Sequence, residues 1–168
     1  MKNKINKNIV PNDFTITLAL IDFMPVIFFF GISIILSIML KSNLFFIGAI
    51  LSFISGFIKV IWKIIVVRKK KNIWILFIQM RIIMPLGFLI SLIGFIIFCI
   101  NNDTNIILSS FNNILSIVFL LLGLIGIILM ISFCFILDSS DKKANWIEQI
   151  CNSLAQLFIL IACIFAIL

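Results

Sequence analysis

Histidine and tyrosine are both absent from this chain of 168 residues, and the six Asp and Glu are outnumbered by thirteen Lys and Arg. Histidine is the commonest proton shuttle and metal ligand, so its absence removes the usual residue for both roles. The sequence contains no GxSxG, no HExxH and no glycine-rich phosphate loop, so hydrolase, metalloprotease and kinase chemistry lack their residues. We therefore expect a protein that is not an enzyme and that has no cofactor and no catalytic residues. The lack of tyrosine beside abundant Ile, Phe, Asn and Lys is typical of an AT-rich bacterial genome.

The four cysteines form no Cys-x-x-Cys pair. Cys99, Cys134, Cys151 and Cys163 each lie within an apolar segment, at different depths, which fits neither a disulfide framework nor a metal site. We interpret them as buried structural thiols and predict no metal centre.

Long polar segments are missing as well. Hydrophobic residues make up 64% of the chain and charged residues 11%, whereas soluble domains have about half and about a quarter. Five apolar segments reach the roughly twenty helical residues that a bilayer core requires. They span residues 14–40, 44–67, 73–100, 111–137 and 146–168. The predicted fold is all-α, a single transmembrane domain over residues 1–168 with five helices, no soluble domain, and a longest loop at 101–110.

The basic residues are distributed asymmetrically along these segments. Placing the N-terminus in the cytoplasm puts every Lys and Arg except Lys41 on the cytoplasmic side. Basic residues in short loops and at span ends set orientation, so we predict an N-terminus inside and a C-terminus outside. The basic start is similar to a signal peptide but lacks a small-residue cleavage site, so we interpret the first apolar segment as a retained span. The predicted location is the bacterial cytoplasmic membrane, as a multi-pass protein.

A net charge of +7 raises the question of a nucleic-acid partner. The basic residues border apolar spans and form no soluble surface, so we expect anionic headgroups of the inner leaflet, and no nucleic acid, as the partner. The run Arg68 to Lys71 is typical of topology signalling, and specific binding of anionic lipid is the alternative role.

The second apolar segment has one narrow face of small residues that ends in two lysines. Its members recur at three- and four-residue steps: Gly48, Ser52, Ser55, Gly56, Lys59 and Lys63. Small residues let a neighbouring helix approach closely, so this face is predicted to pack against protein. Lys59 is then buried, whereas Lys63 lies shallow enough to extend to the interface.

The fourth and fifth apolar segments are patterned too. One side of the fourth, Ser116, Gly123, Gly126 and Met130, is typical of a packing seam. The fifth has a polar arc of Glu148, Gln149, Asn152, Ser153 and Gln156, continued by small residues such as Ala155 and Ala162. Its opposite side, which includes Phe158 and Phe165, is predicted to face lipid.

In this topology seven polar residues share the cytoplasmic half of the membrane: Asp22, Lys59, Lys63, Arg81, Glu148, Asn152 and Gln156. A single unpaired charge there costs about 3 kcal/mol or more, so we predict a polar cluster open to the cytoplasm. The same spacing is also consistent with three simpler arrangements. In the first, Asp22, Arg81 and Glu148 lie at the inner interface and no cavity exists. In the second, Lys59 forms a buried ion pair that fixes the register between two helices. In the third, the polar arc of the fifth segment only forms hydrogen bonds between helices.

The segment Asp22, Phe23, Met24, Pro25 and Val26, followed by Phe28 to Phe30, resembles the opening of the intracellular septation protein A family. Members of that family are small multispan proteins of the bacterial inner membrane. Chain size, number of spans and a basic loop between the second and third spans are similar. The resemblance implies a membrane location and assigns no functional residue.

Two functions follow from these patterns. The first is a non-enzymatic scaffold or interaction subunit, acting as a homo-oligomer or beside another membrane protein. The alternative is a small transporter or channel component whose charged residues line a cytoplasm-facing vestibule for an anionic or protonated solute. In a scaffold, paired neutral substitutions preserve the fold and any partner binding. In a transport pathway, single substitutions leave the fold intact and abolish flux or ligand binding.

Overall fold

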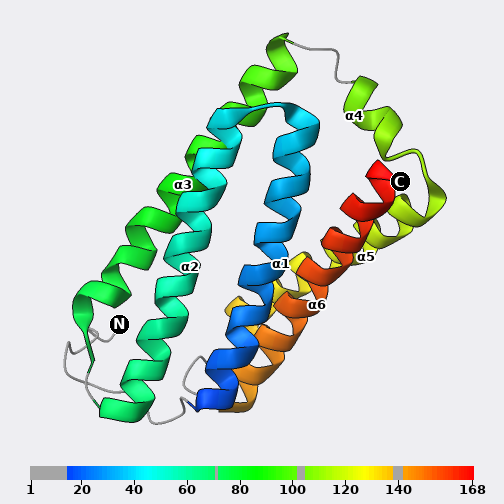
Figure 1. Ribbon diagram of the computed structural model, residues 1–168. Helices are drawn as coiled ribbons and strands as arrows, with labels where there is room; N and C mark the ends of the chain where they lie inside the picture. Colours follow the sequence, from blue (N-terminus) through cyan, green and yellow to red (C-terminus); the bar gives the residue numbers. More distant parts are fainter. Residues whose placement is uncertain (1–14, 71, 102–104, 138–141) are drawn as a thin grey trace.

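The computed structural model describes residues 15–70, 72–101, 105–137 and 142–168, which are almost entirely helical (Figure 1). The helices are α1 (Ile16–Leu40), α2 (Asn43–Lys69), α3 (Trp74–Asn101), α4 (Asn105–Ser110), α5 (Ile114–Ile136) and α6 (Lys142–Ile167). Five of them are long and apolar enough to cross a membrane, which confirms the predicted all-α, five-span fold. The predicted bounds hold to within a few residues. The six-residue helix α4 lies in a stretch that we predicted to be loop. So short a segment shows no helical period in its sequence, so the helix could not be predicted.

Side-chain caps explain where several helices begin. Thr15 Oγ1 accepts a hydrogen bond from the backbone N–H of Leu18 at 3.1 Å, and Ser42 Oγ accepts one from Phe45 at 3.2 Å. Each bond satisfies a donor that has no partner within the helix. Between α1 and α2 the chain reverses through Lys41, whose φ of 46° is left-handed and ends the first helix. The turn is therefore tight, and α1 and α2 run antiparallel.

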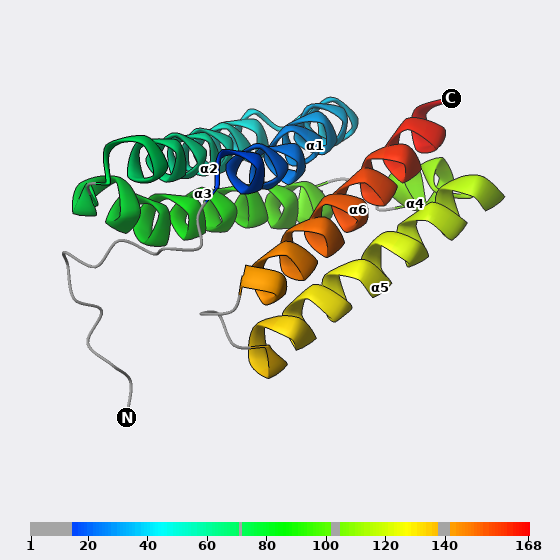
Figure 2. The same cartoon turned by 90° about the horizontal axis from the view of Figure 1, so that it is seen from below.

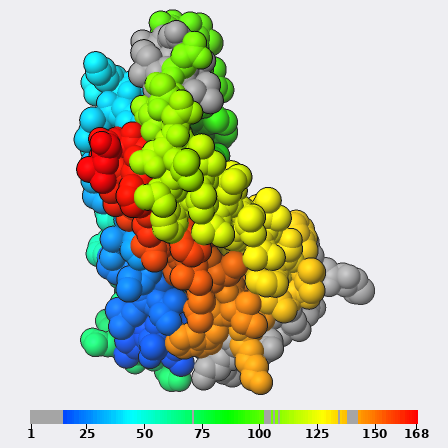
Figure 3. All heavy atoms as spheres, turned by 90° about the vertical axis from the view of Figure 1, so that its right-hand side faces the viewer, coloured from blue at the N-terminus to red at the C-terminus, as the bar shows by residue number. Residues whose placement is uncertain are grey.

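Helix α1 is the centre of the bundle. Within the described ranges the extensive helix interfaces are α1 with α2, α1 with α6, α2 with α3, and α5 with α6. Two hairpins, α2–α3 and α5–α6, therefore flank α1, and Figure 2 shows the second inclined to the first. Figure 3, which faces the right-hand side of Figure 1, shows α6 passing between α1 and α5.

The helix ends separate the charges. The starts of α1, α3 and α6 lie at the same end of the bundle as the end of α2 (Figure 1). The exposed basic residues Arg68, Lys69, Lys70 and Lys143 also lie there, and we call it the basic end. Lys41 lies at the opposite end, so the charge asymmetry is built into the fold. Its direction in a membrane, with the basic end in the cytoplasm, stays a prediction.

Small residues hold α2 against α3. A Cβ atom added to Gly87 would lie 2.5 Å from Ser52 Oγ and 2.7 Å from the backbone oxygen of Gly48, closer than such atoms approach one another. Ser91 Oγ donates a hydrogen bond to the backbone oxygen of Phe45 at 3.1 Å. The small-residue face of α2 therefore packs against protein, as its spacing predicted.

The α5–α6 interface uses the seam predicted on α5. A Cβ on Gly126 would lie 2.7 Å from the Cβ of Ala155, and Ser116 Oγ donates to the backbone oxygen of Ala162 at 2.8 Å. The prediction that Phe158 and Phe165 of α6 face lipid is only partly confirmed. Both side chains are half-buried, and their ring centroids each lie 6.0 Å from that of Phe119 on α5. A helix in a membrane packs aromatic as well as small residues against a neighbour, so hydrophobicity alone does not locate its lipid face.

Candidate functional site

Asp22 on α1 is the charged centre of the bundle. Its side chain is only 2% exposed, and both of its oxygens contact lysines of α2. Lys59 Nζ lies 3.2 Å from Oδ1, and Lys63 Nζ lies 2.9 Å from Oδ2. Lysines four residues apart share one helix face, so a single carboxylate on α1 reaches both. We call these three residues the charged triad.

The two lysines have different surroundings. The side chain of Lys63 is 8% exposed, whereas that of Lys59 is 28% exposed. We predicted that Lys63 would extend to the interface, and this is wrong, because the ion pair with a buried carboxylate holds it inward. Lys59, predicted to be buried, keeps part of its side chain open to a cavity.

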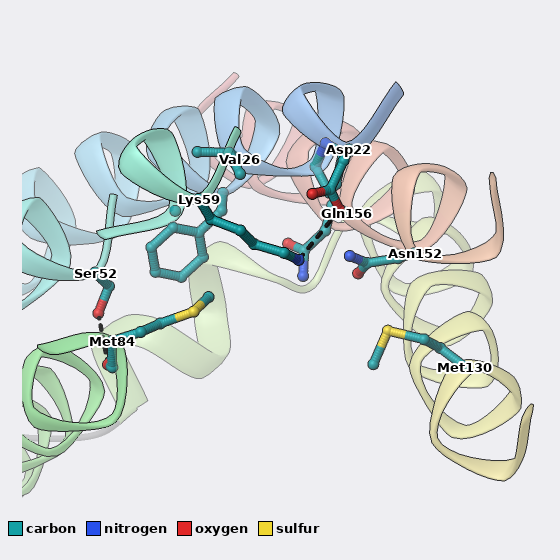
Figure 4. Close-up of a pocket in the computed structure, with 11 residues that line it drawn as sticks. Asp22, Val26, Ser52, Lys59, Met84, Met130, Asn152 and Gln156 are labelled. Atoms are coloured by element: carbon teal, nitrogen blue, oxygen red, sulfur yellow. Dashed lines mark hydrogen bonds and ion pairs between the residues drawn. The ribbon is translucent and has the colours of Figure 1, made fainter. Parts of the chain in front are cut away.

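The cavity has a volume of about 260 Å³ and lies between the two hairpins. Its polar lining comes from α1, α2 and α6, and Figure 4 shows Lys59 pointing toward Asp22 with Asn152 and Gln156 beside it. Each of the remaining long helices contributes one methionine, Met84 from α3 and Met130 from α5. The full lining is Asp22, Pro25, Val26, Phe29, Ser52, Gly56, Lys59, Met84, Met130, Asn152 and Gln156. This combination of an apolar wall and a few convergent polar groups is typical of a ligand site.

A proline in α1 contributes to the polar surroundings of the triad. Pro25 has no N–H, so the backbone oxygen of Ile21 loses its partner within the helix. Ser153 Oγ on α6 lies 3.5 Å from that oxygen, although its shorter contact, 2.7 Å, is with its own Gln149 backbone oxygen. The freed carbonyl therefore faces a polar part of α6, next to Asn152.

A second polar contact fixes the α2–α3 hairpin beside the cavity. Ser55 Oγ donates to Gln79 Oε1 at 3.1 Å, and Gln79 Nε2 donates to the Ser55 backbone oxygen at 3.2 Å. Ser52 Oγ lies 3.3 Å from the backbone oxygen of Met84. The sequence analysis did not identify Gln79. An amide side chain is rare in so apolar a helix, and that rarity could have indicated it.

The structure brings five of the seven predicted polar residues together. Asp22, Lys59, Asn152 and Gln156 line the cavity, and Lys63 joins through its ion pair with Asp22. Arg81 is exposed instead, with its guanidinium 4.6 Å from the ring centroid of Phe77, because it lies on the outer side of α3. Glu148 is half-buried near the start of α6 and is not among the lining residues.

The described residues contain no group of three His, Cys, Asp or Glu side chains that could hold a metal ion. Asp22, with an ammonium group on each oxygen, is poorly suited to abstract a proton from a substrate. Chemically, the arrangement provides an ammonium group with amide neighbours in an apolar cavity.

Comparisons with protein-family models, with curated proteins and with solved structures found no match to this chain. The resemblance of Asp22 to Phe30 to the septation protein family therefore stays an expectation from the sequence. The fold and composition establish a small multispan membrane protein.

Proposed function

We propose that this membrane protein binds an anionic ligand in the cavity, with Lys59 as the counter-ion, as the vestibule of a small transporter or channel component would. The observation that carries the proposal is the position of Lys59, whose side chain is 28% exposed and lines the cavity together with the amides of Asn152 and Gln156. Charge in a membrane interior is costly unless it is paired or lines a polar cavity, so an anion beside Lys59 would lower the energy of the site.

The positions of the three groups decide where that anion belongs. Lys63 and Asp22 are buried together, so within the triad the ammonium group that is most open to the cavity is that of Lys59. Asn152 and Gln156 approach from α6, and their amide N–H groups can donate hydrogen bonds to the same anion. A phosphate or a carboxylate has the charge and acceptor oxygens that these donors require.

The test is thermal unfolding of the purified protein in a non-ionic detergent, with dodecyl phosphate, inorganic phosphate or dodecanol added. A ligand at a hundred times its Kd stabilises the folded state by about 2.7 kcal/mol. We expect one or both phosphates to raise the melting temperature by on the order of 5 °C, since a chain of this length gains a few degrees per kcal/mol. Dodecanol, which has no charge, should have no specific effect.

Matched variants identify the site. Lys59→Met keeps a side chain of similar length without the charge and should abolish the stabilisation. Lys41→Met removes an exposed lysine at the other end of the bundle and should retain it. If Lys59→Met responds to phosphates as the wild type does, the cavity is not the anion site and the proposal fails.

The second candidate is a non-enzymatic scaffold or interaction subunit, in which the triad only ties α1 to α2. The near-complete burial of Asp22 and Lys63 favours it, because that ion pair needs no ligand to explain it. In this case the triple variant Asp22→Asn, Lys59→Met, Lys63→Met should fold and keep its oligomeric state. The wild type should then show no anion-dependent stabilisation.

A further inference from the structure

Among the described residues, α3 and α5 each contribute one side chain to the lining of the cavity, Met84 and Met130. Within the described ranges α3 and α5 share no extensive interface, although both contribute to the cavity. Met84 is 41% exposed, and Figure 4 shows Met84 and Met130 on opposite sides of the space in front of Lys59. Methionine is flexible and apolar, so this boundary can adapt to an acyl chain. We call the space between these two residues the side opening.

We infer that the anionic ligand is an amphiphile, namely a lipid whose headgroup reaches Lys59 from the bilayer through the side opening. This inference rests on the proposed function, and it adds the chemical class of the ligand and the direction from which it arrives. The headgroup lies against Lys59, Asn152 and Gln156. The acyl chains remain between α3 and α5, in contact with Met84 and Met130.

The volume of the cavity supports this division of the ligand. The cavity has a volume of about 260 Å³. A phosphate or carboxylate headgroup fits such a space, and a pair of acyl chains does not. A ligand with long apolar chains must therefore leave them outside the cavity, where the side opening meets the exposed apolar surface of α3 and α5.

The depth of the triad also suits a lipid headgroup. Asp22 comes six residues after the first residue of α1, which places it about 9 Å along the helix axis. The 25 residues of α1 extend about 38 Å, and an upright helix centred in a 30 Å hydrocarbon core has about 4 Å of each end beyond that core. The triad is then only about 5 Å inside the hydrocarbon boundary at the basic end. A headgroup needs a small displacement from its own leaflet to reach it.

The experiment uses the full chain in nanodiscs of phosphatidylcholine, with and without phosphatidylglycerol, and measures bound lipid by native mass spectrometry and stability by thermal unfolding. Glycerol 3-phosphate supplies a phosphate of the same kind without acyl chains. We expect phosphatidylglycerol to bind and stabilise, and glycerol 3-phosphate to do neither at comparable concentration. Lys59→Met should weaken the binding at least tenfold. Lys69→Met, which removes an exposed lysine at the basic end, should change it less than twofold.

Tryptophan substitutions at the two methionines, with one control, test the route. Met130→Trp places a bulky ring at the side opening and should weaken phosphatidylglycerol binding several-fold. Ile128→Trp, on the same helix at a site that is 63% exposed to the surroundings, should not. Met84→Trp tests the opposite wall and replaces Met130→Trp if that variant does not fold.

Each contrary outcome overturns a defined part of the proposal. If glycerol 3-phosphate and phosphatidylglycerol bind equally and both depend on Lys59, the ligand is not a lipid but the proposed anion site stands. If binding does not depend on Lys59, both the lipid inference and the proposed anion site are wrong. Lys59-dependent lipid binding that neither Met130→Trp nor Met84→Trp affects rules out the route through the side opening. A stable dimer that Met130→Trp dissociates would show that a second copy, and not a lipid, occupies the opening.

Discussion

Replacing Asp22 with asparagine should destabilise this protein more than any other single change in the charged triad. Asp22→Asn preserves the shape of the side chain and removes the carboxylate that Lys59 and Lys63 share at 3.2 and 2.9 Å. Removing one partner of a buried ion pair costs about 3–5 kcal/mol, because the remaining charge is left uncompensated. Stabilities of folded domains are about 5–15 kcal/mol, so this is a large share of the total.

The two lysines should respond unequally. Lys63→Met leaves Asp22 paired with Lys59 but deprives a buried carboxylate oxygen of its partner, which costs about 1–3 kcal/mol. Lys59→Met leaves the enclosed Asp22–Lys63 pair intact, so we expect a change below about 1 kcal/mol. Combining Asp22→Asn with Lys63→Met should recover about 2 kcal/mol of the Asp22→Asn loss, because one enclosed charge is removed.

The assay is denaturant-induced unfolding in detergent micelles, followed by circular dichroism, with the free energy of unfolding compared across the series. Lys41→Met serves as the control, since Lys41 is exposed and lies at the opposite end of the bundle. The reasoning is refuted if Asp22→Asn costs no more than Lys59→Met, or if the double variant is less stable than Asp22→Asn alone.

Three further predictions concern the fold. Gly87→Leu should lower the free energy of unfolding by at least about 2 kcal/mol and loosen the α2–α3 contact, because the position has no space even for a Cβ atom. An unchanged free energy of unfolding would contradict the packing described for that hairpin. Ser116→Ala should cost about 1 kcal/mol through its buried bond to α6, whereas Ser132→Ala, with an exposed bond within its own helix, should be neutral; the comparison uses the same unfolding assay. In intact cells an impermeant maleimide should label Leu44→Cys but not Lys69→Cys; the reverse pattern would invert the predicted topology.

The sequence predicted the helices well because membrane spans impose a strong constraint. Every backbone polar group in hydrocarbon must be bonded within its own segment, so a long apolar stretch with few charges is almost always a helix. The packing faces of α2 and α5 were also predictable, since Gly48 and Gly126 belong to rows of small residues at helical spacing.

The site was only partly predictable. Helical spacing placed Lys59 and Lys63 on one face, but it did not reveal that Asp22 contacts both, because the offset between α1 and α2 depends on the turn at Lys41. The sequence places Arg81 at a membrane depth similar to that of the triad, but in the structure it lies on an outer face of α3. Depth can be estimated from sequence, whereas the rotation of a span about its axis follows from packing.

The side opening could not be predicted at all. Met130 belongs to the predicted packing seam of its helix and Met84 is an ordinary apolar residue, and neither position carries a sequence signal for a cavity. Their position at the cavity follows from the angle between the two hairpins, which depends on how α1 packs with α2 on one side and α6 on the other.

The most direct test of the anion site is to locate an anion by diffraction. Crystals of the protein grown in a lipid phase and soaked in sodium bromide would reveal bound bromide by its anomalous scattering. We predict a peak within hydrogen-bond distance of Lys59 Nζ, inside the cavity, that is lost in Lys59→Met. Peaks confined to the exposed basic residues of the basic end, with none at Lys59, would contradict the proposed site.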